Sequence, residues 1–196
     1  MSNQTLYIVT YTGPFGFIKP WTAVRDAETF SQQFLTPSIL GGIERKLFPE
    51  LLNEPFDIFK IKGYRLSHGG ISMQQEQTQP RGWNKDKKDL VRKYAIIDRG
   101  VMLNPVLRLA FDAEENAQIA AGQHICLCRN EDVLLPNPEI ITTTSEAFED
   151  THYDGFELVF EENEQSFLVG YNRLDGGKPM YGWLKIVGSP VKSTQI

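Results

Sequence analysis

The sequence predicts an α+β fold, because segments with the alternation of β-strands and segments with helical spacing follow one another along its 196 residues. The order is strand, helix, strand, a long middle segment, strand, helix and strand, and several short strands follow. This β-α-β-β-α-β order is typical of a ferredoxin-like core, which is also the core of RNA-binding domains of the RRM type. The length suits one domain with its own hydrophobic core.

The first strand and the first helix carry clear signals. Residues 6–11 form a β-rich run that Gly13 and Pro14 terminate. Thr36 is a typical helix N-cap and Pro37 a typical first helical residue. The helical spacing predicts a buried face of Ile39, Leu40, Ile43 and Leu47, and a solvent face of Glu44, Arg45 and Lys46.

Three later segments complete the predicted core. Residues 57–66 alternate, which predicts a half-buried strand with lysines on its open face. A second strand is expected at 106–111, and residues 112–121 are compatible with a short acidic helix that Gly122 ends. Residues 67–88 between the two strands show no sustained period, and loops of that length are usually functional or disordered.

The C-terminal part is expected to be rich in strands. Residues 156–160, 167–171 and 181–187 are strand-like, and acidic or Gly-Gly segments separate them. Three consecutive strands joined in this way predict a C-terminal β-meander.

The net charge of −5 conceals a strong segregation. Residues 56–109 contain eleven Lys and Arg against five Asp and Glu, whereas residues 110–165 contain fourteen acidic residues and one basic residue, Arg129. The basic half is suited to nucleic acid and the acidic half to a basic protein surface. The alternative is that both are solvated faces. Gln, Gly and an aromatic ring interleave the basic residues, which favours nucleic-acid binding.

Composition also bears on compartment and cofactors. Cys126 and Cys128 lack the spacing of a zinc knuckle or a redox motif, and neither His124 nor His152 has a second histidine at metal-ligand spacing. No apolar run approaches the roughly 20 residues that span a bilayer, and the first residues do not resemble a signal peptide. We therefore expect a soluble cytoplasmic protein with no metal, no cofactor and no membrane partner.

Two glycine-containing segments indicate a backbone site for phosphate. Residues 11–21 resemble a strand and a glycine-marked turn, and residues 36–45 a proline-started helix that contains Gly41 and Gly42. Glycine lets backbone N–H groups approach an anion, and a helix N-terminus attracts one. Spacing alone makes this a weak signal, because most glycine turns only reverse the chain.

The same segments resemble a known family. Residues 12–21, with the sequence Thr-Gly-Pro-Phe-Gly-Phe-Ile-Lys-Pro-Trp, and the Thr-Pro-Ser-x-x-x-Gly-Ile helix at 36–43 are similar to the Cas-five subunit of type I CRISPR Cascade complexes. That subunit caps the 5′ end of the guide RNA. Further short motifs follow the order of type I-C members, at residues 79–81, 97–101, 122–131 and 188–190.

The resemblance implies an RRM-like domain with a protruding β-hairpin thumb. We expect residues 1–125 to form this RNA-binding domain, with the thumb inserted at about 67–95, and residues 126–196 to form a β-rich extension that completes the same domain. The implied partners are the 5′ handle of the guide crRNA, the backbone and large subunits of Cascade, and target DNA indirectly.

Basic and aromatic residues are the expected RNA contacts. Lys and Arg attract phosphates, and Trp83 or Trp21 would stack an unpaired base, a contact worth about 1–3 kcal/mol. The alternative for each tryptophan is packing in the core. The expected RNA-binding residues are Lys19, Trp21, Arg25, Ser38, Gly41, Gly42, Arg45, Arg65, His68, Arg81, Trp83, Lys85, Lys87, Lys88, Arg92, Lys93 and Arg99.

The resemblance also raises the question of catalysis. Type I-C members cut precursor RNA without metal, with a tyrosine just after the glycine helix and a nearby Lys-His pair that serve acid–base chemistry. Phe48 occupies the tyrosine position, and residues 112–123 contain no lysine, so we expect no catalytic residue. Two alternatives stay open: an endoribonuclease that uses Tyr64, His68 and Lys62, and an interaction protein whose acidic half mimics nucleic acid.

Overall fold

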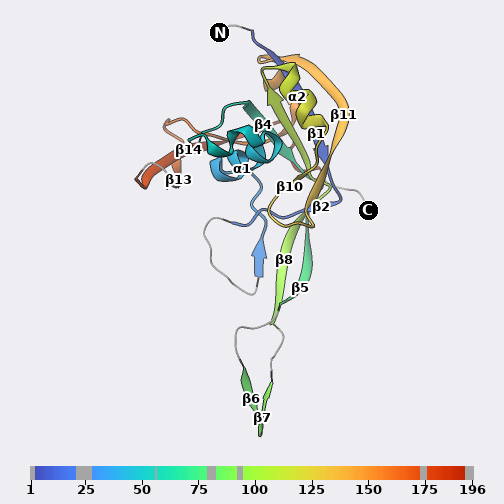
Figure 1. Ribbon diagram of the computed structural model, residues 1–196, viewed down its shortest axis with the longest axis vertical. Helices are drawn as coiled ribbons and strands as arrows, with labels where there is room; N and C mark the ends of the chain where they lie inside the picture. The colour runs from blue at the N-terminus through green and yellow to red at the C-terminus, as the bar shows by residue number, and fades with distance from the viewer. Residues whose placement is uncertain are drawn as a thin grey trace.

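The computed structural model describes residues 3–20, 28–55, 57–78, 83–91, 95–172 and 176–192, which form an α+β fold with mostly antiparallel strand pairs (Figure 1). The helices are α1 (Pro37–Leu47) and α2 (Glu114–Ala121), with 3₁₀ helices η1 (Pro49–Asn53), η2 (Ala147–Glu149) and η3 (Thr151–Tyr153). The strands are β1 (Thr5–Thr12), β2 (Phe15–Gly16), β3 (Glu28–Phe30), β4 (Ile61–Ser67), β5 (Ile71–Thr78), β6 (Asn84–Asp86), β7 (Asp89–Val91), β8 (Ala95–Leu103), β9 (Val106–Phe111), β10 (Ile125–Cys126), β11 (Val133–Thr144), β12 (Gly155–Val159), β13 (Phe167–Asn172) and β14 (Lys178–Val187).

The largest sheet has eight strands in the order β10-β11-β1-β9-β4-β12-β14-β13. At its centre, β1 pairs antiparallel with β11 and with β9, and β9 pairs antiparallel with β4. In the chain, α1 lies between β1 and β4, and α2 between β9 and β11. Strands from both residues 1–125 and residues 126–196 therefore share one sheet.

The helix α1 and the central strands share a hydrophobic core. Leu40, Ile43 and Leu47 of α1 are buried in one cluster with apolar residues of β1, β4 and β9. The predicted start of this helix is confirmed, because Thr36 is its N-cap and Pro37 its first residue. Among the helices of the described residues, none is long and apolar enough to cross a membrane.

Glu44 corrects the predicted solvent face of α1. Its side chain is fully buried, and its carboxylate accepts backbone N–H groups of Phe59 at 3.0 Å, Lys60 at 2.6 Å and Ile61 at 2.9 Å. The chain segment before β4 therefore covers a helix position that periodicity assigns to solvent. Since Glu44 takes up these N–H groups, β4 begins at Ile61 rather than at residue 57.

A long hairpin projects from the body of the molecule (Figure 1). We give this name to the element formed by β5 to β8. β5 pairs antiparallel with β8 from Ile71 opposite Met102 to Thr78 opposite Ala95, and β6 pairs with β7 at the outer end. β2 and β3 also pair with β8 and so hold the base of the hairpin. The sequence predicted an aperiodic segment at residues 71–78. They form a strand instead, because each of them is paired with a residue of β8.

The C-terminal strands are present, but their order corrects the predicted meander. The last strand, β14, lies between β12 and β13 in the sheet. The first half of this ten-residue strand pairs with β13 and the second half with β12. Just before β14, Gly176 and Gly177 have φ values of +59° and +75°, a backbone conformation that suits glycine at a chain reversal.

Candidate nucleic-acid interface

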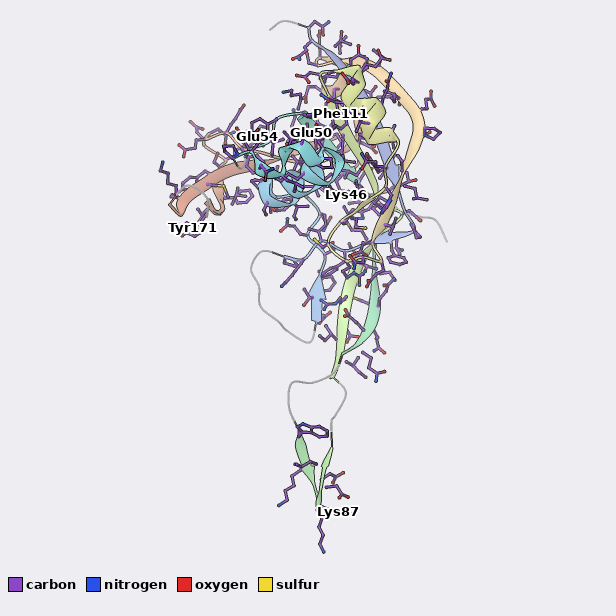
Figure 2. All side chains as sticks on the ribbon, viewed as in Figure 1. Lys46, Glu50, Glu54, Lys87, Phe111 and Tyr171 are labelled. Carbon is purple, nitrogen blue, oxygen red and sulfur yellow. The ribbon has the colours of Figure 1, made fainter. Side chains whose placement is uncertain are left out.

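The outer end of the long hairpin is exposed and basic. Lys85 lies on β6, and Lys87 and Lys88 form the turn between β6 and β7; all three are exposed, and Lys87 is at the extreme tip (Figure 2). Trp83, just before β6, has 59% of its surface exposed, so it is a surface residue rather than a core residue. Cations and an exposed aromatic ring suit single-stranded nucleic acid, through phosphate attraction and base stacking.

The tip turn holds Lys87 in an uncommon conformation. Its φ is 54°, in the left-handed region that glycine or asparagine usually occupies in two-residue hairpin turns. Asp86 and Asp89 are directly opposite each other at the ends of β6 and β7. Two like charges in that arrangement repel, and the two lysines between them offset the repulsion. The tip thus keeps a lysine where glycine would be less strained.

A cavity of about 250 Å³ lies at the base of the long hairpin. The Arg99 guanidinium is paired with Glu76 and lies 5.2 Å from the centroid of the Phe17 ring. The Arg129 guanidinium lies 5.3 Å from the same ring and bonds Asp132 at 2.6 and 2.8 Å. Because carboxylates balance both guanidinium groups, the cavity offers an anion little net positive charge. Its lining residues are Phe15, Gln74, Gln75, Glu76, Arg99, Arg129 and Glu131.

No family model and no curated protein matches this sequence. Within the described ranges, no group of three His, Cys, Asp or Glu side chains is placed to hold a metal ion.

Two ionisable residues expected at the RNA surface are buried instead. Arg65 is fully buried: it pairs with Glu157 and with Glu149 at 3.0 Å, and its guanidinium lies 4.5 Å from the centroid of the Phe148 ring. These partners lie more than 80 residues away in the sequence, so no local pattern indicates the burial. A guanidinium with no exposed surface is not available to a phosphate, and Arg65 joins β4 to the C-terminal extension instead.

His68 is the second of these residues. It is 3% exposed, and its ring nitrogens lie 3.1 Å from the Gly70 carbonyl and 3.0 Å from Gln33 Oε1. The imidazole is stacked on the Phe156 ring, with centroids 6.4 Å apart. Burial lowers the pKa of His68, and the bond to Gly70 offsets part of this effect. A neutral, enclosed imidazole contributes no positive charge to an RNA surface.

The N-terminal part of α1 is exposed in part. Ser38 and Gly42 are exposed, whereas Gly41 is buried. A Cβ atom added at Gly42 would have nothing within 4 Å, so this glycine does not serve close packing. Arg45 donates to the carbonyl of Pro55 at 3.0 Å and to that of Gly41 at 3.3 Å, which ties α1 to the segment after η1.

The remaining predicted contacts are Lys19 and five residues that lie outside the described ranges. Lys19 is exposed in the segment that follows β2. The hairpin tip and α1 lie far apart in Figure 1, so the structure does not gather the predicted residues into one cluster. Five predicted residues lie outside the described ranges, namely Trp21, Arg25, Arg81, Arg92 and Lys93.

The residues considered for catalysis have structural partners. Phe48 is buried edge-on against Phe111, with centroids 6.1 Å apart. The Tyr64 hydroxyl accepts the N–H of Leu158 at 2.7 Å and bonds the backbone of Leu35, and burial raises the pKa of this hydroxyl. Lys62 donates to Asp112 at 3.2 Å. Tyr64 therefore has no exposed hydroxyl to exchange a proton with a substrate.

Proposed function

We propose that this chain is a Cas-five subunit of a type I CRISPR Cascade complex, that it binds and caps the 5′ handle of the guide crRNA, and that its core is ferredoxin-like of the RRM type. The strand order β11-β1-β9-β4, with α1 and α2 in the connections between strands, supports the proposed core. Four antiparallel strands with β-α-β-β-α-β connectivity are typical of that fold.

The observation that carries the proposal is the exposed cationic and aromatic tip of the long hairpin. The family to which the motifs are similar has a thumb at this position in the chain. Lys85, Lys87 and Lys88 would contact phosphates, and Trp83 would stack on a base of the handle or of the first guide nucleotides. Phosphate contacts of this kind position the RNA without reading its sequence.

We propose further that the subunit holds crRNA without cutting it. The side chain at the family's tyrosine position, Phe48, has no ionisable group and is buried. General acid–base cleavage needs a group that reaches the 2′-hydroxyl, and the enclosed Tyr64 and His68 side chains are poorly suited to this. In this proposal a separate nuclease matures the RNA, and the protein acts in the cytoplasm with the backbone and large subunits.

Co-purification from the native host cells tests the proposal. The tagged chain should bring down short RNAs that share a 5′ sequence and then diverge, together with protein subunits of one complex. A variant with Lys85, Lys87 and Lys88 all changed to Gln should recover less of this RNA. Recovery of basic proteins with no RNA would favour the nucleic-acid mimic and contradict the proposal.

Incubation of the purified protein with the recovered repeat RNA in EDTA at neutral pH tests the absence of cutting. The RNA should stay intact. A single discrete cut that His68→Ala or Tyr64→Phe abolishes would instead establish an endoribonuclease.

A further inference from the structure

The hairpin formed by β13 and β14 presents apolar side chains to solvent. Leu168, Tyr171 and Tyr181 are 39%, 60% and 41% exposed. Leu168 is directly opposite Tyr181, and Tyr171 is opposite the exposed Pro179. Directly opposed residues share a face, and so do residues two apart on β14, so these four side chains form one strip. We call them the apolar strip; Figure 2 shows Tyr171 at the outer end of this part of the molecule.

The same hairpin ends the large sheet. β13 is the last strand in the sheet order, and among the described residues it pairs with β14 and no other strand. One side of β13 therefore carries backbone N–H and C=O groups with no strand beside them. Natural edge strands are commonly protected by lysine or proline, and β13 contains neither, although a register shift between Leu168 and Gly170 bends it. An edge next to an apolar strip is suited to accept a further strand.

The charge around the edge restricts what binds there. The connection before β13 exposes Glu161, Glu162 and Glu164, and residues 160–172 contain no Lys or Arg; the exposed Lys178 of β14 is opposite Asn172, at the other end of β13. Carboxylates repel phosphate, so nucleic acid is a poor occupant. The charge is complementary to a protein segment that carries Lys or Arg.

We propose that β13 and the apolar strip bind an extended segment of a partner protein, in which apolar residues alternate with basic ones. The segment adds a strand to the free edge of β13. Its apolar side chains cover Leu168, Tyr171 and Tyr181, and its basic side chains meet the three glutamates. This interaction goes beyond the proposed RNA binding and does not depend on it.

An NMR titration of the full-length chain tests this proposal. The probe is an acetylated and amidated eight-residue peptide of alternating Val and Lys. We expect its addition to shift the backbone amide signals of residues 167–171 in a saturable way. The matched peptide of alternating Val and Glu should bind with at least about tenfold lower affinity, because its charge repels the acidic connection. A Val-Lys peptide with N-methylated valines should also bind more weakly, because it has lost backbone donors.

Two variants locate the site. The double variant Leu168→Lys, Tyr171→Lys should bind the Val-Lys peptide at least about tenfold more weakly than the wild type. Leu52→Lys, at a residue of η1 that is 64% exposed, should leave its affinity unchanged. Absence of shifts in β13, or equal shifts with the Val-Glu peptide, would overturn the proposal. RNA binding by the wild type is measured in parallel. A wild type that binds the peptide but no RNA would contradict the proposed function and leave the peptide site standing.

Discussion

Glu44 illustrates how a single buried charge organises the chain around it. Its carboxylate accepts three backbone N–H groups between 2.6 and 3.0 Å, from residues that lead into β4. Hydrogen bonds to a charged group contribute about 1.5–3 kcal/mol each, more than neutral ones. This carboxylate therefore ties α1 to the start of β4 and fixes where the strand begins.

We predict that Glu44→Ala destabilises the fold by roughly 3 kcal/mol or more, because it leaves buried N–H groups without an acceptor. Urea denaturation measures the change in the free energy of unfolding. Glu50→Ala, at an exposed residue whose carboxylate pairs with Lys60 at 2.6 Å, is the matched control and should leave that free energy nearly unchanged. Equal effects from the two substitutions would show that the bonds at Glu44 do not stabilise the fold.

A second prediction concerns His68. Burial lowers its pKa from the ordinary value of 6.5, so the folded state disfavours the protonated ring. Because the pKa of His68 is lower in the folded state, its contribution to the free energy of unfolding is fully present above pH 6.5. That contribution is lost as the pH falls from 6.5 through the pKa of the folded state. The wild type should therefore lose more stability than His68→Gln between pH 7.5 and pH 5.5, as urea denaturation at both values would show. An identical pH dependence in the variant would contradict this account.

The sequence did not indicate that these charges are buried. Glu44 sits at a helix position that the 3.6-residue period assigns to solvent, and Arg65 lies in a strand of alternating character. Their partners come from distant segments: residues 59–61 cover Glu44, and Glu149 and Glu157 meet Arg65. Local spacing carries no information on such contacts. The sequence left open whether Trp83 is exposed or packed in the core, and the structure exposes it.

At the scale of elements, the tip of the long hairpin combines a strained turn with positive charge. We predict that Lys87→Gly keeps the hairpin intact, because glycine adopts a φ of 54° without steric cost. The same change should weaken RNA binding by the loss of one phosphate contact. Backbone chemical shifts of residues 84–91 and RNA affinity are the two measurements. Unchanged affinity would mean that Lys87 does not contact RNA.

The exposed glycine of α1 gives a second prediction at this scale. Gly42→Val should leave stability unchanged within about 0.5 kcal/mol, because nothing lies within 4 Å of the added Cβ. If the backbone here approaches RNA or a neighbouring subunit, the variant should still lose assembly. Gly155→Val is the control for packing, since its Cβ would lie 2.7 Å from Arg65 Cβ and should destabilise the fold by about 1–3 kcal/mol. Thermal melts and complex recovery separate the two effects, and intact assembly of Gly42→Val would exclude a contact at this helix.

Elements with regular patterns were predictable, and elements shaped by their partners were not. The helix α1 begins at the predicted Pro37, and the strand predicted at 106–111 coincides with β9. No pattern indicated β11, because Pro136 and Pro138 interrupt it. Pro136 is opposite Tyr11, and Pro138 lies where the register between β1 and β11 shifts, between the pairs Tyr11–Pro136 and Val9–Ile140. The order of the C-terminal strands was also hidden, because it depends on which half of β14 pairs with which neighbour.

At the scale of the whole molecule, the basic tip and the acidic, apolar edge are separate surfaces. Lys87 and Tyr171 mark two different extremities in Figure 2. The charge segregation of the sequence is kept at these two extremities but not in the body of the molecule, where Lys62, Arg65 and Arg108 of the basic half pair with carboxylates of the acidic half. In the two proposals, one chain holds RNA at the hairpin and a protein segment at the sheet edge, and neither occupant covers the other's surface.

The salt dependence of RNA binding tests whether the long hairpin binds RNA through its tip lysines. The wild type and the variant with Lys85, Lys87 and Lys88 changed to Gln are titrated with the co-purified RNA over a range of salt concentrations. Each phosphate contact contributes about 0.7 to the slope of log K against log salt for single strands, so the variant's slope should be smaller by about 2. Lys62→Gln, whose ammonium instead pairs with Asp112, serves as the control and should keep the wild-type slope. An unchanged slope in the triple variant would contradict the assignment of the long hairpin as the RNA-binding element.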